Sequence, residues 1–191
     1  MWVDVAALRA FLERLGVDVS AWADTELEER IRLAELAFKA ETKREFDAAD
    51  YDERYDGTDT DCLVLRHFPV IELYEVAYAG RTTVTLSPLV DKERGLLLLQ
   101  NGSVWKRGRR NIRVRYRAGY EQIPADVSRA TLLLAAMFVL TESPSEFERR
   151  GLKSFRVLNY REDYQGPFSR QFEEWRQEVK DIVERYRRAR L

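Results

Sequence analysis

Residues 111–140 read NIRVRYRAGYEQIPADVSRATLLLAAMFVL, and this stretch decides the fold class. In its first part, Ile112, Val114 and Tyr116 alternate with arginines, which is the pattern of an antiparallel strand with one buried face. In its second part, the run from Val127 to Leu140 is almost entirely apolar, as in a helix buried inside a protein core. The sequence therefore predicts a chain that combines a sheet with a central helix.

Segments with strand character lie upstream of this stretch. Cys62 to Leu65 and Gly95 to Gln100 are short apolar runs, and Thr82 to Leu86 is rich in β-branched residues. Asn101-Gly102 is a strong hairpin signal, because both residue types tolerate positive φ. We predict a small antiparallel β-region of about four to six strands between about residues 55 and 120.

Helices are predicted on both sides of the β-region. One spans Val5 to Leu15, and a longer helix with an acidic outer face spans Thr25 to Phe46. Thr25 and Glu28 have the spacing of a capping box at the start of the longer helix. These two helices and the apolar helix at 127–140 form the predicted bundle.

A last helix follows a Gly-Pro break at residues 166–167 and carries a largely aromatic stripe. The stripe recurs at steps of four and three, as in a heptad seam, at Phe168, Phe172, Trp175, Val179, Ile182 and Tyr186. This periodicity leaves open whether the seam closes the protein's own core or docks in a partner's groove.

Together these elements predict an α+β, mainly α fold. We expect a helical bundle with a small antiparallel β-insertion and an extended C-terminal helix. Residues 1–165 are expected to form the helical domain with the β-insertion at about 55–120. Residues 166–191 are expected to form a separate helix that is dispensable for the folding of the rest.

Composition excludes several classes of function. The 191 residues hold 32 Lys and Arg against 33 Asp and Glu, so there is no overall positive charge for binding nucleic acid. The chain has one cysteine, Cys62, and one histidine, His67, which excludes a Cys-rich zinc site and a multi-His metal centre. No Gly-rich phosphate motif is present, so no cofactor is expected. Without a signal peptide or a membrane-spanning run, the sequence predicts a soluble intracellular protein.

Catalytic chemistry has one set of candidates, Asp59, Asp61 and His67, which would suit a hydrolase. The sequence identifies no nucleophile and no orienting acid beside them. Clusters of Asp, Thr and Gly usually form turns, and a calcium loop would require a glutamate where His67 stands. We therefore expect no catalytic residue and no metal site, and a hydrolase is the weakest of three hypotheses.

Charge is strongly segregated along the chain. Lys106 to Arg117 contains seven cations and no acid, whereas Asp18 to Asp61 contains fifteen acids and six cations. The basic segment has three interpretations: a nucleic-acid contact aided by Trp105 and Tyr116, a solvated or intramolecularly paired face, or a contact with the acidic segment of a neighbouring copy.

The order of short segments along the chain is also informative. These segments are Tyr55-Asp56-Gly57-Thr58, Leu63-Val64-Leu65, Pro69-Val70, residues 111–120, residues 123–127 and the basic ending Val183 to Arg188. In this order, over about residues 24 to 142, the chain resembles the head–tail connector (adaptor) proteins of long-tailed double-stranded DNA phages. Asp59 stands where this family often has glycine, and the region after Phe147 is longer than in many connectors.

The resemblance implies a structural protein without enzymatic activity. Such connectors form a homo-oligomeric ring below the portal protein, which by resemblance would be a dodecamer in the virion. The ring extends the DNA channel, lets DNA pass without sequence-specific binding, and docks the next neck (stopper) or tail protein. The implied location is the virion neck, with assembly in the host cytoplasm and no membrane partner.

Two sets of interaction residues are expected on this basis. The family uses its terminal segment against the portal, which assigns portal binding to the stripe and basic end of the last helix: Phe168, Phe172, Trp175, Val179, Ile182, Tyr186, Arg187 and Arg188. The subunit interface is expected where acidic helix and basic strand meet: Glu28, Glu35, Arg109, Arg110, Arg113 and Arg115. The main alternative is a nucleic-acid-binding or regulatory protein that uses the basic strand Lys106–Arg117.

Overall fold

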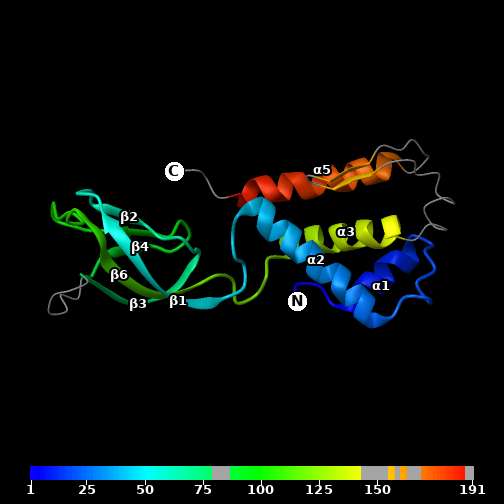
Figure 1. Ribbon diagram of the computed structural model, residues 1–191, viewed down its shortest axis with the longest axis horizontal. Helices are drawn as coiled ribbons and strands as arrows, with labels where there is room; N and C mark the ends of the chain where they lie inside the picture. The colour runs from blue at the N-terminus through cyan, green and yellow to red at the C-terminus, as the bar shows by residue number, and fades with distance from the viewer. Residues whose placement is uncertain (79–86, 143–154, 158–159, 163–168, 188–191) are drawn as a thin grey trace. The chain divides into compact units, whose positions relative to one another are not determined.

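A computed structural model of the chain describes residues 1–78, 87–142, 155–157, 160–162 and 169–187. These residues divide into two compact units (Figure 1). The helical unit contains residues 1–44 and the chain from residue 123 onward, and the β unit contains residues 45–122. The strand predicted at residues 82–86 lies outside the described residues.

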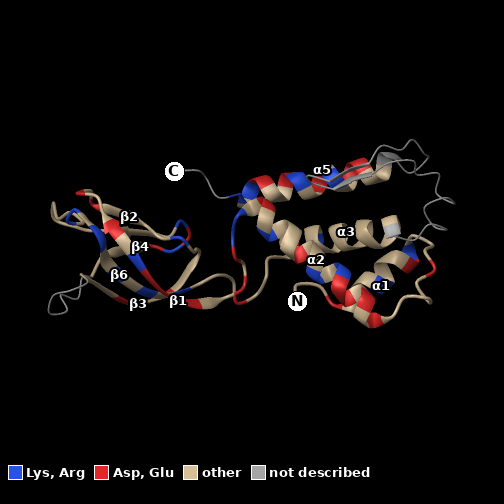
Figure 2. Ribbon diagram, viewed as in Figure 1, with Lys and Arg blue, Asp and Glu red and all other residues tan. Residues whose placement is uncertain are grey.

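The described part of the helical unit contains four helices: α1 (Val5–Arg14), α2 (Asp24–Thr42), α3 (Ala125–Glu142) and α5 (Ser169–Tyr186). Two short strands, β7 (Phe155–Val157) and β8 (Tyr160–Glu162), pair as an antiparallel hairpin. Helix α3 contacts α1, α2 and α5, so it is the centre of the unit. Leu133 and Met137 of α3 are fully buried, which confirms the predicted central helix. Figure 2 shows α3 nearly free of charged residues, as expected for a helix that is covered on most sides.

Helix α2 differs from its prediction at both ends. It begins at Asp24, and the backbone N–H of Ala23 donates to the Glu26 carboxylate at 2.8 Å, so the predicted Thr25–Glu28 capping box is wrong. The helix ends at Thr42, where Lys43 adopts a left-handed conformation with φ 56°, and does not continue to Phe46.

The described part of the β unit forms two three-stranded antiparallel sheets. The larger sheet has the order β1 (Ala49–Gly57), β6 (Gly108–Ala118), β3 (Val70–Tyr78), and the smaller has the order β2 (Cys62–Val64), β5 (Leu96–Leu98), β4 (Leu89–Asp91). Ile112, Val114 and Tyr116 of β6 are fully buried, as their alternation predicts. They share one core with Trp105 and Leu97.

The prediction of a mainly α fold is wrong. Helices and strands are roughly balanced, because the β unit is a full second unit and not a small insertion. The difference arises largely from β1, a nine-residue strand whose sequence, ADYDERYDG, is rich in acids and poor in β-branched residues. Its acids face the arginines of β6, so cross-strand charge pairs stabilise a strand that propensity does not favour.

Candidate interaction surfaces

Three arginines of β6 alternate with its buried residues and have partners in their own sheet: Arg113, Arg115 and Arg117. Arg113 pairs with Asp52 of β1 through two hydrogen bonds, Arg115 with Glu75 of β3 at 3.5 Å, and Arg117 with Asp50 of β1 at 3.4 Å. The hydrogen bond from Arg113 holds the pKa of Asp52 below its usual value. Arg113 and Arg115, which were predicted for the subunit interface, are thus paired inside the β unit, with strands β1 and β3 and not with the acidic helix.

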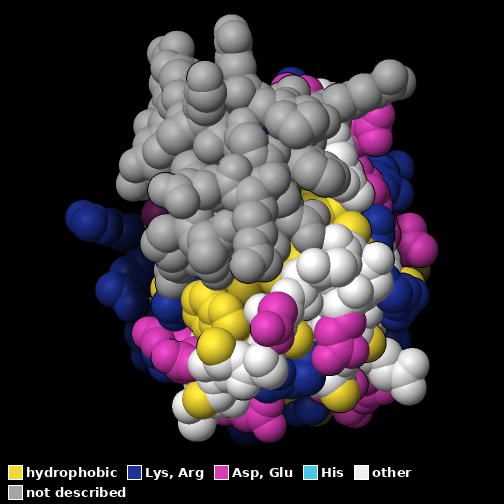
Figure 3. Space-filling view, turned by 90° about the vertical axis from the view of Figure 1, so that its right-hand side faces the viewer, with side chains coloured by type: hydrophobic (Ala, Val, Ile, Leu, Met, Phe, Trp, Pro, Cys, Tyr) yellow, Lys and Arg dark blue, Asp and Glu magenta, His cyan; other side chains and the backbone are white. Residues whose placement is uncertain are grey.

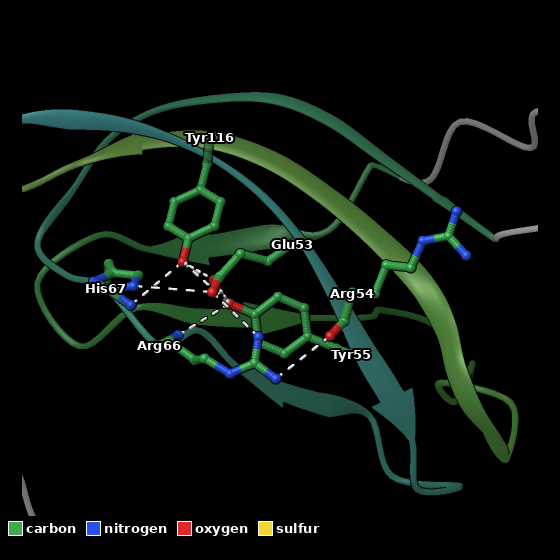
Figure 4. A network of polar contacts seen from close by, with 6 residues as sticks. All are labelled: Glu53, Arg54, Tyr55, Arg66, His67 and Tyr116. Atoms are coloured by element: carbon green, nitrogen blue, oxygen red, sulfur yellow. Dashed lines mark hydrogen bonds and ion pairs between the residues drawn. The ribbon is translucent and has the colours of Figure 1, made fainter.

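A network of polar side chains centres on Glu53 of β1 (Figure 4). The hydroxyl groups of Tyr55 and Tyr116 donate to Glu53 Oε2, at 2.5 and 2.7 Å, and Arg66 Nη1 donates to Oε1 at 3.2 Å. Both hydroxyl groups also accept a hydrogen bond from the backbone. The Arg66 N–H donates to the Tyr55 hydroxyl at 3.0 Å, and the His67 N–H donates to the Tyr116 hydroxyl at 3.3 Å. The network therefore joins β1 and β6 to the segment that follows β2.

The network has a fixed protonation state at neutral pH. Burial raises the pKa of Glu53, but hydrogen bonds from Tyr55, Tyr116 and Arg66 outweigh burial, so the net pKa lies below its usual value. Burial, together with the nearby carboxylate, raises the pKa of Tyr55 and of Tyr116. Glu53 is therefore ionised while both phenols stay protonated. This state favours a structural role, in which the network holds the strands together, over a role in proton transfer.

The three hydrolase candidates, Asp59, Asp61 and His67, contact different residues and do not form one site. The His67 ring stacks on Tyr51, with centroids 3.8 Å apart, and its Nε2 lies 3.9 Å from Glu53 Oε1. Asp59 instead accepts the N–H of Arg107 at 2.8 Å, and the Asp61 carbonyl accepts the indole N–H of Trp105 at 3.0 Å. Within the part of the chain that the structure describes, no cluster of His, Cys, Asp and Glu could hold a metal ion.

The basic loop, which we define as residues 106–110, follows the buried Trp105 and includes the irregular start of β6, where its register with β1 shifts. Its backbone is held by two aspartates: Asp59 accepts the N–H of Arg107, and Asp56 accepts the N–H of Arg110. These acids therefore fix the course of the loop without pairing with its cationic side chains. The loop side chains, including the expected interface residues Arg109 and Arg110, are exposed.

The aromatic stripe of α5 lies inside the helical unit. Phe172 and Trp175 are each 7% exposed, and Val179 and Ile182 are buried as well. The Trp175 ring packs against Phe172 and against Phe11 of α1, with centroids 5.4 and 5.5 Å apart. Of the two interpretations of the seam, the structure matches the one in which it closes the protein's own core.

The end of α5 is more accessible than its stripe. The Tyr186 hydroxyl donates to Asp126 of α3 at 2.9 Å, and the exposed Arg187 pairs with Glu41 of α2 at 3.4 Å. Phe168 and Arg188, the other expected portal-binding residues, lie outside the described residues.

The acidic helix α2 has only part of its expected interface available. Glu35 accepts the backbone N–H of Trp2, whereas Glu28 is exposed. Leu33 and Leu36, one helical turn apart, are 40% and 55% exposed. Figure 3 shows one face of the helical unit, where charges of both signs surround hydrophobic side chains. Among the described helices, none is long and apolar enough to cross a membrane.

Sequence reasoning did not identify Glu53 or the acids of β1 as partners of the arginines. The signal was present, because Tyr51, Glu53 and Tyr55 alternate with charged residues at the period of a strand. Asp56-Gly57 is a dipeptide typical of turns, and it ends this alternation. Trp105 and Tyr116, which one of the three interpretations of the basic segment places at a nucleic acid, are both fully buried.

Comparison with known proteins yields structural matches only. No protein-family model matches the chain, and no curated protein matches it. A chain from the neck of an empty gene transfer agent (GTA) particle, computed with C6 symmetry, matches with a TM-score of 0.59 at 19% identity, covering 98% of this chain and 90% of that chain.

Two further structures agree with this match. A chain from the virion of the native GTA particle matches with a TM-score of 0.56 at 20% identity, covering 98% of this chain and 90% of that chain. A chain from the neck of the native particle, computed with C12 symmetry, matches with a TM-score of 0.55 at 16% identity over 98% and 89%. The protein therefore has the fold of chains found in the neck of a phage-like particle, as its resemblance to head–tail connectors leads one to expect.

Proposed function

We propose that the protein is a structural, non-enzymatic component of the neck of a phage-like particle, where it assembles as a ring. The observation that carries this proposal is the fold shared with a GTA neck chain over 98% of this chain and 90% of that one. The related neck structures were computed with C6 and C12 symmetry. We therefore expect a ring of twelve copies.

Within the neck, we assign the ring a position below the portal, where it extends the DNA channel and docks the next neck or tail protein. The portal contact is assigned to the basic end of the chain, Arg187 and Arg188, because the apolar stripe of α5 is used in the core. The contact between subunits is assigned to the outer face of α2, where Leu33 and Leu36 are exposed beside Glu28.

Mass photometry of the purified chain, alone and with portal rings, tests the proposal. We expect the portal ring to gain the mass of twelve copies. Leu36→Lys should prevent this gain, because it places a charge in the proposed contact. Leu89→Lys is a matched control, since Leu89 of β4 is 56% exposed, like Leu36 at 55%.

Two results would count against the proposal. If the wild-type chain leaves the mass of portal rings unchanged at every concentration tested, the neck assignment is wrong. If Leu36→Lys and Leu89→Lys both assemble as the wild type does, the ring contact lies on another face.

A further inference from the structure

The basic loop has an excess of cations that the protein does not neutralise. Lys106, Arg107, Arg109 and Arg110 are all exposed. Among the described residues, none of their side chains forms an ion pair, in contrast to the paired arginines further along β6. The charge of the loop is therefore available to an external anion.

The loop is also held in place before any ligand binds. The Gly57 N–H donates to Asn111 Oδ1 at 2.9 Å, and Asn111 Nδ2 donates to the Lys106 carbonyl at 2.8 Å. Gly57 approaches the loop so closely that a Cβ atom there would lie 1.9 Å from the Lys106 oxygen. The buried Trp105 anchors the entry to the loop through its backbone N–H, which donates to Thr60 at 2.7 Å. A fixed loop loses little conformational entropy when its cations meet a ligand.

An open hollow extends the cationic surface beyond the loop. It is lined by Arg109 and Arg110, together with Arg54 of β1, which forms no ion pair among the described residues. Three acids line the hollow against five arginines. Asp52 pairs with Arg113, Glu53 accepts from its tyrosines and Arg66, and Asp56 accepts the backbone N–H of Arg110. The hollow therefore keeps a net positive charge next to the loop.

The acids of a second copy are a poor match for this surface. Most acids of the segment from Asp18 to Asp61 have partners within their own chain, such as Asp24 with Arg9 and Glu41 with Arg187. Glu28 of α2 and Asp61 are exposed, and neither carboxylate forms an ion pair among the described residues. The unpaired acids are thus few and far apart in the sequence, whereas the unpaired cations of the loop are close together, which favours a polyanion with closely spaced charges.

The surface also lacks what single-stranded nucleic acid requires. Base stacking needs exposed aromatic rings, but Trp105 and Tyr116 are fully buried.

Guanidinium groups form strong hydrogen bonds with phosphate oxygens, and a row of phosphates can pair with several cations at once. We propose that the basic loop, with Arg54, binds the phosphate backbone of duplex DNA independently of sequence. This binding belongs to the single chain and does not depend on assembly into a ring.

Anisotropy titrations of a labelled mixed-sequence duplex with the full chain test this proposal. Five cations on five phosphates should give a slope of about −4.5 in log affinity against log salt between about 50 and 200 mM NaCl. The variant Lys106→Gln/Arg107→Gln/Arg109→Gln should reduce the steepness of that slope by about 3 and weaken binding at least about tenfold at the low-salt end. The variant leaves intact the backbone contacts that hold the loop.

The matched control removes two arginines and one lysine from other exposed positions: Arg32→Gln/Arg94→Gln/Lys180→Gln. It has the same net charge as the loop variant, and we expect it to bind DNA like the wild type. Equal melting temperatures of the wild type and both variants establish that differences in binding do not arise from unfolding.

Three outcomes would overturn the proposal. The first is equal DNA binding by the loop variant and the control. The second is tighter binding of a thymine single strand than of the duplex, which would indicate base stacking. The third is a salt-dependent dimer, seen by light scattering, that the loop variant abolishes while DNA binding stays unchanged, which would assign the loop to a second copy.

Discussion

Glu53 joins parts of the β unit that are far apart in the sequence. It accepts hydrogen bonds from Tyr55 of its own strand, Tyr116 of β6 and Arg66 after β2. The two phenols are largely buried, so each needs an acceptor inside the protein. A single carboxylate thus satisfies both, and it links β1 to β6.

Glu53→Gln should lower the free energy of unfolding by about 1–3 kcal/mol at pH 7, because an amide is a weaker acceptor for hydrogen bonds previously made to a charged group. The pKa of Glu53 in the folded protein lies below the unfolded value of 4.5. Its contribution is therefore complete above pH 4.5 and is lost as the pH falls through the folded pKa.

Urea unfolding of both proteins at pH 7 and at about pH 3 measures this effect. The difference in stability between wild type and Glu53→Gln should shrink at the lower pH. Glu72→Gln, on the exposed face of β3, serves as the control and should leave the stability unchanged. A gap between wild type and Glu53→Gln that is the same at both pH values would show that the charge of Glu53 has no role.

At the same scale, local pattern explains which residues of β6 are buried. Ile112, Val114 and Tyr116 could be assigned to the core from alternation alone, because a strand places alternate side chains on opposite faces. The partners of the arginines between them could not be assigned. Arg113 meets Asp52 only once the antiparallel register of β1 and β6 is set, and that register depends on contacts distant in the sequence.

Among the elements, strand β1 is held partly by its charges. Arg113→Glu should lower the melting temperature, because it sets a carboxylate beside Asp52 in place of the guanidinium. The loss should be smaller at high salt, since both groups are partly exposed and screened. Arg107→Glu is the control: its side chain has no ion pair among the described residues, so the fold should tolerate the reversal. Equal melting temperatures for the two variants would contradict the pairing.

Helix α5 is a core element by its packing, although its stripe alone could equally serve a partner. A heptad-like spacing indicates that a helix has one apolar face, but it does not indicate which element or partner covers that face. Here α3 and α1 cover it, with Phe11 against Trp175 and Arg129 paired with Glu178 at 3.0 Å. The missing information is the tertiary arrangement, which no periodicity in α5 contains.

Trp175→Ala should therefore cost about 3–5 kcal/mol of unfolding free energy, because it leaves a cavity between α5 and α1. Lys180→Ala, on the exposed side of the same helix, should cost little. Chemical denaturation of both variants measures the difference.

Deletion of the chain after Gln165 should give an aggregating protein. A soluble truncated protein with an unchanged melting temperature would instead restore the view that the last helix is dispensable for folding.

For the whole molecule, the main feature is that residues 45–122 form a unit whose two ends meet. Tyr120 donates its backbone N–H to the Phe46 carbonyl at 2.7 Å, and the two rings stack with centroids 6.0 Å apart. A bridge between Asp47 and Tyr120 adds to this closure. A segment with joined ends and its own core is expected to fold without the rest of the chain.

The fragment 45–122, produced alone, should therefore unfold in a single cooperative urea transition and keep the β-rich circular dichroism of its sheets. Its stability should depend on the closure of the ends. Gly119 has φ 113°, and a Cβ atom there would lie 2.5 Å from the Asp47 carbonyl oxygen. Gly119→Ala should thus lower the midpoint of the transition, because it strains the backbone and forces Asp47 away. Gly102→Ala is the control for a positive φ without a close contact, since Gly102 has φ 70° and open space around it, and its midpoint should fall less. A fragment that shows no cooperative transition would mean that the β unit needs the helical unit in order to fold.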